Sequence, residues 1–526
     1  MKQPEVHSQQ TGEARMWLIA VTVMLGTFME VLDTSVANVA LPHIAGSLSA
    51  SQDESTWVLT SYLVSNAIVM PLSGWLCSVF GRKRFYLFCV ALFTLASLLC
   101  GLAPNLPSLI IFRILQGAGG GVLVPISQAI LVETFPGELQ GLAMAVYGLG
   151  VMFAPVIGPT LGGWITDNYS WRWIFFINGP VGLIALVMAY VLVTEPPYLR
   201  GTARGKIKVD YIGLGLIAVG LGFMQVVLDK GQREDWFESR WILWMSITVV
   251  VSLVAMVFWE LRQKEPVVDL GLLKERNFFI CTLTMFVVGF AVYGSLVLLP
   301  LFLQTLMGYT AAKSGMVLSP AGLVLVLLMP LVGYLLSKVQ ARWLVLAGLG
   351  VVGLALIRMA RFNLNVDFRM AMRARMLQSV GEALLFVPIN TAAFYFIAKE
   401  KTASGTGFMN LARNVGGSFG ISIVTTILAR RQQFHQNILV AHLTPFDNRA
   451  YSMLSSARGL LVSKGSDPAQ AVSQSYGFVY QVVQQQSAML AFADTFWLLG
   501  IGLLALVPFI LLMKKTVPGK VSLGAH

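Results

Sequence analysis

Two carboxylates stand in the middle of the first long apolar stretch of the chain. Glu30 and Asp33 lie inside the run from Met16 to Pro42, which is long enough to cross a bilayer. Three residues apart on a helix, they lie on roughly one face. A charge at the bilayer centre costs at least ~2.5 kcal/mol on insertion scales, so such residues usually face a bundle interior or a water-filled cavity and are functional. Two carboxylates this close would titrate as a coupled unit; the alternative is that they only hydrogen-bond a neighbouring helix.

Composition indicates what surrounds these carboxylates. The chain has 526 residues, of which 56% are hydrophobic and 12% charged, and apolar runs of about 20 residues, the length of a membrane helix, recur from end to end. The expected fold class is therefore an all-α polytopic membrane protein. The net charge of +12 is explained by basic residues that border membrane helices, and no nucleic-acid partner is expected. The four cysteines fall in or beside apolar runs and indicate no disulfide framework.

Apolar segments predict fourteen membrane spans in a six, two, six plan. The first six and the last six would each form a bundle, and two further spans would lie between charged connectors. The first run is long and is followed by many more, so it is expected to stay as a span and not to be cleaved as a signal peptide. The predicted spans are 16–41, 56–77, 84–103, 107–132, 139–165, 172–194, 209–228, 241–261, 278–304, 314–337, 342–362, 373–397, 403–428 and 489–513.

Basic residues set the expected orientation of these spans. Clusters such as 82–84, 200–208 and 514–515 fall on one side, which the positive-inside rule assigns to the cytoplasm. An even number of spans puts both termini there. The expected parts are a cytoplasmic tail at 1–15, an N-terminal six-helix bundle at 16–194, two linker helices with their loops at 195–277, a C-terminal six-helix bundle at 278–513 that includes a long outer loop at 430–487, and a cytoplasmic tail at 514–526.

The two blocks of six spans resemble each other. The pattern Arg-x-Leu-Gln-x-x-Gly occurs at 113–119 and again at 375–381, in the fourth span of each block. The pattern Pro-Leu-x-Gly-x-Leu closes the second span at 71–76 and its counterpart at 330–335. Repeated halves are typical of secondary transporters, whose substrate site lies between the halves near the midplane.

Four segments carry longer motifs. They are LDTSVANVALP at 32–42, GWLCSVFGRK at 74–83, RILQGAGGG at 113–121 and APVIGPTLGG at 154–163. Together they resemble the fourteen-span drug:proton antiporter family of the major facilitator superfamily, the EmrB/QacA group, and its EmrB branch in particular. The resemblance covers nearly the whole chain. It implies two six-helix bundles around a central cavity, plus two extra transmembrane helices.

The resemblance gives the first carboxylates a role. It implies that Asp33 takes part in proton coupling or in holding the site, and that Arg113 lies nearby and shifts its proton affinity. Glu30 is not a fixed part of the motif, so its role depends on its position alone. The alternative for Arg113 is an arginine that snorkels to the interface.

Two motifs imply gating and helix packing. The cytoplasmic signature has glycines for a tight turn and basic residues that can bond carbonyls at helix ends, although Ser78 replaces its usual aspartate; the basic cluster could instead serve orientation only. The span-five motif is associated with exporters and bends and thins its helix. The expected gating and packing residues are Gly74, Gly81, Arg82, Lys83, Gly117, Pro155, Gly158, Pro159, Gly162 and Gly163.

Polar and aromatic residues in the spans are candidates for the substrate cavity. Glu382 follows the repeated pattern directly; it could bind a cation, carry a second proton, or pair with Arg413. Aromatic side chains could line a lipophilic cavity, although most would face lipid or pack helices. The cavity candidates are Asn38, Tyr62, Gln116, Tyr147, Phe153, Tyr293, Glu382 and Asn390.

The polar stretch 430–486 falls on the outer side, and its later part reads as an amphipathic helix. A long loop with its own structure is often functional. The resemblance implies docking to a periplasmic adaptor protein that leads to an outer-membrane channel. The alternative is a solvated loop without a partner.

These features predict a proton-coupled multidrug efflux transporter that exports lipophilic toxic compounds by alternating access from the bacterial inner membrane. The expected partners are drug-like substrates, protons, the lipid bilayer and the adaptor complex. The chain lacks a phosphate-binding loop and an H-E-x-x-H motif, so neither ATP, nor a metal, nor another cofactor, nor enzymatic activity is expected. The alternatives are an exporter of one endogenous metabolite, lipid or siderophore, and a membrane scaffold for an adaptor complex.

Overall fold

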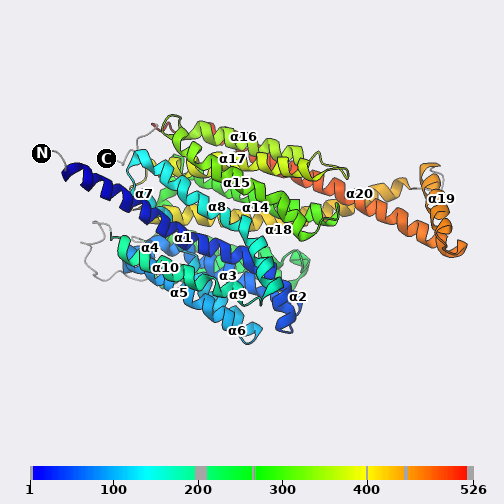
Figure 1. Ribbon diagram of the computed structural model, residues 1–526, viewed down its shortest axis with the longest axis horizontal. Coiled ribbons are helices and arrows are strands. Elements are labelled where there is room, and N and C mark those ends of the chain that lie inside the picture. Colours follow the sequence, from blue (N-terminus) through cyan, green and yellow to red (C-terminus); the bar gives the residue numbers. More distant parts are fainter. Residues whose placement is uncertain are drawn as a thin grey trace.

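The computed structural model describes residues 4–195, 210–263, 266, 268–398, 401–443 and 448–517, and its elements are all helices (Figure 1). The N-terminal and C-terminal ends of the chain lie at the same end of the molecule, opposite helix α19 (Asn448–Ser463). The predicted basic cluster 200–208 lies outside the described residues.

The N-terminal half contains the first six predicted spans. The second span is broken at the 3₁₀ turn η1 (Met70–Leu72), where proline interrupts the helix. The fourth is broken after Gly120, within a run of three glycines. The helices are α1 (Pro4–Ser47), α2 (Gln52–Ser55), α3 (Trp57–Val69), α4 (Ser73–Phe80), α5 (Arg82–Leu102), α6 (Leu106–Gly120), α7 (Leu123–Thr134), α8 (Gly137–Asn168), α9 (Trp173–Phe176) and α10 (Asn178–Leu192).

Two linker helices, α12 (Tyr211–Lys230) and α13 (Arg240–Glu260), follow. Helix α12 is bonded to both halves of the molecule. Its Lys230 Nζ donates to Thr56 Oγ1 at 2.6 Å beside α3, and its Gln225 Oε1 accepts from Ser418 Oγ at 2.9 Å in the C-terminal half. Helix α12 is therefore part of the bundle, and α13 packs against α12.

The C-terminal half repeats the helical plan of the first. It begins with the 3₁₀ turn η3 (Leu270–Lys274) and ends with a short helix after the last span. Its helices are α14 (Arg276–Thr305), α15 (Ala311–Leu336), α16 (Ala341–Met359), α17 (Phe368–Phe394), α18 (Thr402–His442), α19, α20 (Pro468–Leu504) and α21 (Val507–Leu511).

Thirteen helices of the described residues are long and apolar enough to cross a membrane, against fourteen predicted spans. The predicted span 373–397 corresponds to α17, which is a 27-residue helix but is not among the thirteen. Its arginines and Glu382 lower its hydropathy, and it packs between α15 and α16 within the bundle. The polar side chains of α17 are therefore features of an interior helix.

Three helices run past the boundaries predicted for their spans. Helix α1 begins at Pro4, within the predicted tail 1–15, although its part that is long and apolar enough to cross a membrane begins at Ala14, close to the predicted residue 16. In the segment 430–487, predicted as a long outer loop, α18 continues to His442 and α20 begins at Pro468, where the amphipathic helix was predicted, with α19 between them. Residues 429–442 contain no glycine or proline, so the helix does not stop where hydrophobicity ends. These helices form an arm that projects beyond the bundle (Figure 1).

The two halves touch at the end of the molecule where the termini lie. Asn410 Nδ2 of α18 donates to Gln128 Oε1 of α7 at 2.7 Å. A Cβ added to Gly74 of α4 would lie 2.6 Å from the backbone nitrogen of Ser404, so a larger residue at this position does not fit against α18. This contact between the halves is called the inner closure below.

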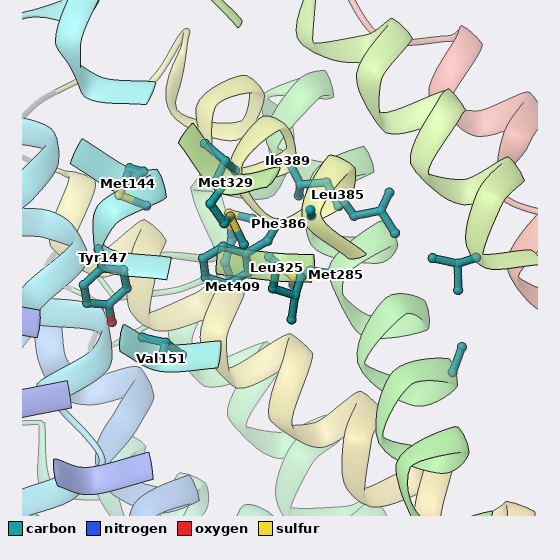
Figure 2. Packing of buried hydrophobic residues seen from close by; sticks show 14 of the residues in the cluster. Met144, Tyr147, Val151, Met285, Leu325, Met329, Leu385, Phe386, Ile389 and Met409 are labelled. Carbon is teal, nitrogen blue, oxygen red and sulfur yellow. The ribbon is translucent and has the colours of Figure 1, made fainter. Parts of the chain in front are cut away.

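A buried cluster rich in methionine fills the space between the halves (Figure 2). Met144 and Tyr147 of α8 lie opposite Met329 of α15 and Phe386 of α17, with Met409 of α18 beside them. Methionine is flexible and polarisable, so this cluster can repack with little strain.

Glycines set the spacing of α14 and α18. A Cβ on Gly289, Gly416 or Gly420 would lie within 3.0 Å of a backbone carbonyl of the other helix. Gly416→Ala should therefore lower the stability of the detergent-solubilised protein by roughly 1–3 kcal/mol through overpacking. Thermal unfolding would measure the change, with Gly350→Ala as the matched control, because nothing lies within 4 Å of a Cβ there. Equal melting temperatures for the two variants would contradict this account of the α14–α18 contact.

Candidate functional site

Arg113 of α6 lies at the centre of a buried polar network. Its guanidinium is 0% exposed and Asp33 of α1 is 3% exposed. Arg113 Nη1 donates to Asp33 Oδ2 at 2.5 Å, and Gln116 Nε2 donates to Asp33 Oδ1 at 2.8 Å. Asn178 Nδ2 of α10 donates to the same Oδ1 at 2.8 Å. The ionised form of Asp33 thus has a cation and two amide donors within bonding distance.

The surrounding helices hold Arg113 in place. Arg113 Nε donates to the carbonyl of Val58 at 3.0 Å, and the guanidinium lies 4.2 Å from the ring centroid of Tyr62. Gly117, one turn along α6, allows this approach, because a Cβ there would lie 2.5 Å from the Tyr62 carbonyl. The side chain therefore points into the bundle, and the snorkelling alternative does not describe it.

Glu30 lies one turn from Asp33 and has different partners. It is 7% exposed and accepts hydrogen bonds from Tyr62 Oη at 3.0 Å and Asn66 Nδ2 at 3.1 Å. Both donors are uncharged groups of α3. Arg413, which α18 brings from the C-terminal half, lies within electrostatic reach of Glu30. Charged side chains of opposite sign from the two halves thus lie near each other.

Several partners of these carboxylates were missed in the sequence. Asn178, Asn66 and Ser97 form part of the network, and Ser97 Oγ accepts from Asn178 Nδ2 at 2.9 Å. Asparagine inside an apolar span is a usable signal, since a buried amide must find partners. Helix packing decides which carboxylate such an asparagine bonds, and the spacing of residues along the chain does not reveal that packing.

The other predicted cavity residues are spread over the molecule. Tyr147 is buried and its hydroxyl lies 3.3 Å from Thr27 Oγ1 near the centre, and Tyr293 packs against Gly417. Asn390 Nδ2 donates to its own helix at Phe386 O, at 2.7 Å. Asn38 is exposed and Phe153 half-buried.

Glu382 belongs to a separate cluster in the C-terminal half. It pairs with Arg375 of its own helix, with 2.7 Å between Arg375 Nη1 and Glu382 Oε1. The ion pair considered with Arg413 is therefore not the one that forms. Arg413 instead lies with its guanidinium 5.9 Å from the ring of Phe386.

The cytoplasmic signature makes its contacts through two glutamates that sequence reasoning missed. Gly81 has φ +81°, a conformation that glycine adopts readily. The Arg82 guanidinium pairs with Glu133 of α7, and the backbone nitrogens of Arg82 and Lys83 donate to Glu195 at 2.7 and 3.2 Å. Ser78, in place of the usual aspartate, bonds its own helix.

The span-five motif packs α8 against α1. A Cβ on Gly162 would lie 2.9 Å from Val36, and one on Gly158 would clash with Ser35. Pro155 and Pro159 lie inside the α8 helix, and Gly163 is farther from its neighbour Val39 than the other two glycines are from theirs. The motif therefore touches the helix that carries Glu30 and Asp33.

A family model described as the Major Facilitator Superfamily matches residues 23–421. The chain belongs to this superfamily of membrane transporters, which confirms the predicted family and helical fold and the expectation that it is not an enzyme. The proton:xylose symporter XylE has the same fold, with a TM-score of 0.62 at 15% identity over 97% of this chain and 98% of XylE.

Relatives with closer sequences are export and resistance proteins. The chain is 37% identical over 504 residues to the fatty acid resistance protein FarB of Neisseria gonorrhoeae, covering 96% of this chain and 97% of FarB. It is 35% identical over 486 residues to the multidrug export protein EmrB of Escherichia coli (strain K12), covering 92% and 93%. The predicted resemblance to the EmrB branch is confirmed.

Removal of one member of the Arg113–Asp33 pair should be costly. Arg113→Gln leaves a buried carboxylate without its counter-ion, and loss of one partner from a buried pair costs about 3–5 kcal/mol. Asp33→Asn should also destabilise the protein, while the double variant should lose less than the sum of the two. Thermal unfolding of the three purified variants measures this, and strictly additive losses would contradict the pairing.

Proposed function

We propose that the protein is a proton-coupled exporter of lipophilic toxic compounds in a bacterial inner membrane, with both termini in the cytoplasm. The observation that carries this proposal is the placement of Glu30. It lies beside the buried Asp33–Arg113 pair and within electrostatic reach of Arg413 from the other half. A carboxylate between two halves that move against each other can link protonation to their arrangement.

The two carboxylates have different partners. Arg113 and two amides donate to Asp33, whereas the hydrogen-bond donors to Glu30 are uncharged. In the proposed cycle Glu30 and Asp33 exchange the proton as one unit, and Arg113 sets the field in which it binds. Each charge moved across the membrane supplies ~2.3 kcal/mol per 100 mV.

Structural features also favour export of apolar compounds. The methionine-rich cluster offers an adaptable apolar surface of the kind found in promiscuous binders. The names of FarB and EmrB, a fatty acid resistance protein and a multidrug export protein, support the same class of substrate.

The arm built by α18, α19 and α20 is the proposed docking element for a periplasmic adaptor protein that continues to an outer-membrane channel. It extends beyond the bundle on the side opposite the termini (Figure 1). Exposed aromatic side chains on it, Tyr451, Tyr476 and Tyr480, are of the type enriched at protein interfaces.

Transport in proteoliposomes tests the proton-coupled mechanism. The native protein should export ethidium, acriflavine and rhodamine 6G when an inward proton gradient is imposed, because proton uptake drives the cycle. Glu30→Gln and Asp33→Asn should each reduce efflux to the level seen without a gradient. Glu54→Gln is the control, because Glu54 only caps the short helix α2.

The outcomes separate the alternatives. Gradient-independent efflux by the native protein would exclude the antiporter mechanism. Transport of one compound out of a broad panel would favour an exporter of a single metabolite, lipid or siderophore. Normal cellular resistance after Asp33→Asn would favour a scaffold.

Removal of the arm tip tests the adaptor proposal. Replacement of residues 444–466 by a short glycine–serine linker should leave dye efflux from proteoliposomes unchanged, because the tip is remote from Glu30. The same change should abolish resistance in cells that need export across two membranes. Full resistance in such cells would contradict docking at α19.

A further inference from the structure

The two halves place their carboxylates at different positions of the same repeat. The pattern at 113–119 recurs at 375–381, so Gly120 in the first half corresponds to Glu382 in the second. A Cβ on Gly120 would lie 2.6 Å from Tyr62 Oη and 3.2 Å from Glu30 Cγ. The room left by glycine in the first half is thus filled by Glu30, which enters from α1.

A second correspondence involves the helices that face these arginines. Gln116 donates to Asp33 of α1 at 2.8 Å, and Gln378 donates to Ser295 of α14 at 2.7 Å. Since α14 is the first span of the second half, Ser295 stands where Asp33 stands in the first. Each half therefore combines an arginine, a glutamine and a carboxylate, but the second half takes its carboxylate from α17 itself.

Glu382 has the environment of a buried ionisable group. It is 7% exposed and Arg375 is 8% exposed. Glu382 Oε1 accepts from Arg375 Nη1 at 2.7 Å and from Gln378 Nε2 at 3.0 Å. Among the described residues, three buried polar atoms nearby on the same helix have no hydrogen-bond partner: Arg375 Nε, Gln378 Oε1 and Ser379 Oγ.

Within the described part of the chain, the two clusters differ in which atoms lack a partner: in the first half it is Arg113 Nη2, a donor, whereas the second half also leaves an acceptor, Gln378 Oε1. In the first half, Arg113 Nε is bonded to the Val58 carbonyl and Gln116 Oε1 accepts from Arg113. In the second half, Gln378 Oε1 is a free acceptor on the residue that already bonds Glu382. A protonated Glu382, or a water that delivers the proton, can donate to it.

The ion pair is also unnecessary for helix packing. Arg113 and Asp33 join α6 to α1, whereas Arg375 and Glu382 lie seven residues apart on one helix. Loss of the charge on Glu382 separates no helices, and the bond between Gln378 and Ser295 still joins α17 to α14. The pair can therefore open without parting two helices, and the cost of opening is the buried charge left on Arg375.

Glu382 lies next to the moving interface. Phe386 is one turn further along the same face of α17, and it packs with Met329 against Gly148 of α8 (Figure 2). The charged and titratable groups on the helices packed against α17 are few among the described residues. Besides Arg413, which lies against Phe386, they include Tyr147, Cys281 and Tyr293 and residues toward helix ends, Arg276, Lys313, Tyr334, Arg342, Arg358 and Asp167.

We propose that Glu382 is a second proton-binding site, in the C-terminal half, so that each export cycle carries two protons. In the step, hydronium gives its proton to the Glu382 carboxylate, an O–H bond forms, water is released, and Arg375 loses its counter-ion. The inference depends on the proposed proton-coupled export.

The proton stoichiometry tests this inference. Proteoliposomes with equal potassium on both sides and valinomycin are brought to equilibrium with ethidium or rhodamine 6G at several imposed pH differences. At zero membrane potential, each proton exchanged per dye molecule changes the equilibrium ratio of dye concentrations across the membrane about tenfold for each unit of pH difference. Two protons therefore give about 100-fold per pH unit, and one proton gives about tenfold. The native protein should give the two-proton slope and Glu382→Gln the one-proton slope.

A rescue variant keeps the test independent of folding. Glu382→Gln combined with Ser295→Asp moves the carboxylate to the position that Asp33 has in the first half, within reach of Gln378, and should restore the two-proton slope. A one-proton slope in the native protein, or an unchanged slope in Glu382→Gln, would overturn the second site while leaving proton-coupled export intact. The absence of any gradient dependence in the native protein would instead contradict the proposed function itself.

Discussion

A guanidinium enclosed among membrane helices must have its charge balanced inside the protein, and Arg113 makes this constraint the organising feature of the N-terminal half. Its side chain is fully buried, so α1 has to bring Asp33 to it and α3 has to bring the Val58 carbonyl. Asn178 then ties α10 to the same carboxylate. The cost of an unpaired charge in hydrocarbon thereby fixes how four helices sit relative to one another. The contacts that stabilise this half are also those of the proposed proton site.

Close packing at glycine provides the second constraint. Without a hydrophobic driving force between helices in lipid, small residues let backbones approach, as Gly117 does at α3 and Gly416 at α14. In the repeated segment of the two halves, a glycine position also decides where a carboxylate lies. Gly120 leaves room that Glu30 occupies, whereas its counterpart in the second half is the carboxylate Glu382. The two halves are thus built to one plan while their charged side chains come from different helices.

Sequence patterns predicted the helical class, the spans and the burial of the first two carboxylates, because hydropathy and charge within an apolar run are local signals. They failed where hydropathy alone does not decide the structure. Helix α18 extends to His442 because the residues after 428 still favour helix although they are no longer hydrophobic. A boundary set by hydropathy at residue 428 therefore falls too early. The partners of Arg82 are Glu133 and Glu195, which packing of distant segments brings together. The pairing of Glu382 with Arg375 was hidden for a different reason, since both lie in α17 but seven residues apart, beyond the usual spacing of helical ion pairs.

The connection between the carboxylates and the inner closure runs through one segment of the chain. Both donors to Glu30, Tyr62 and Asn66, belong to α3. Helix α3 passes through the turn at Pro71 directly into α4, whose Gly74 meets Ser404 of the other half. In the proposed cycle, protonation of Glu30 would remove the charge that these two donors stabilise, and so would weaken the hold of α1 on α3. Because α4 packs closely on α18 at Gly74, a small displacement of α3 would be transmitted to the contact between the halves. A continuous stretch of backbone thus connects the proposed proton site with the contact between the halves.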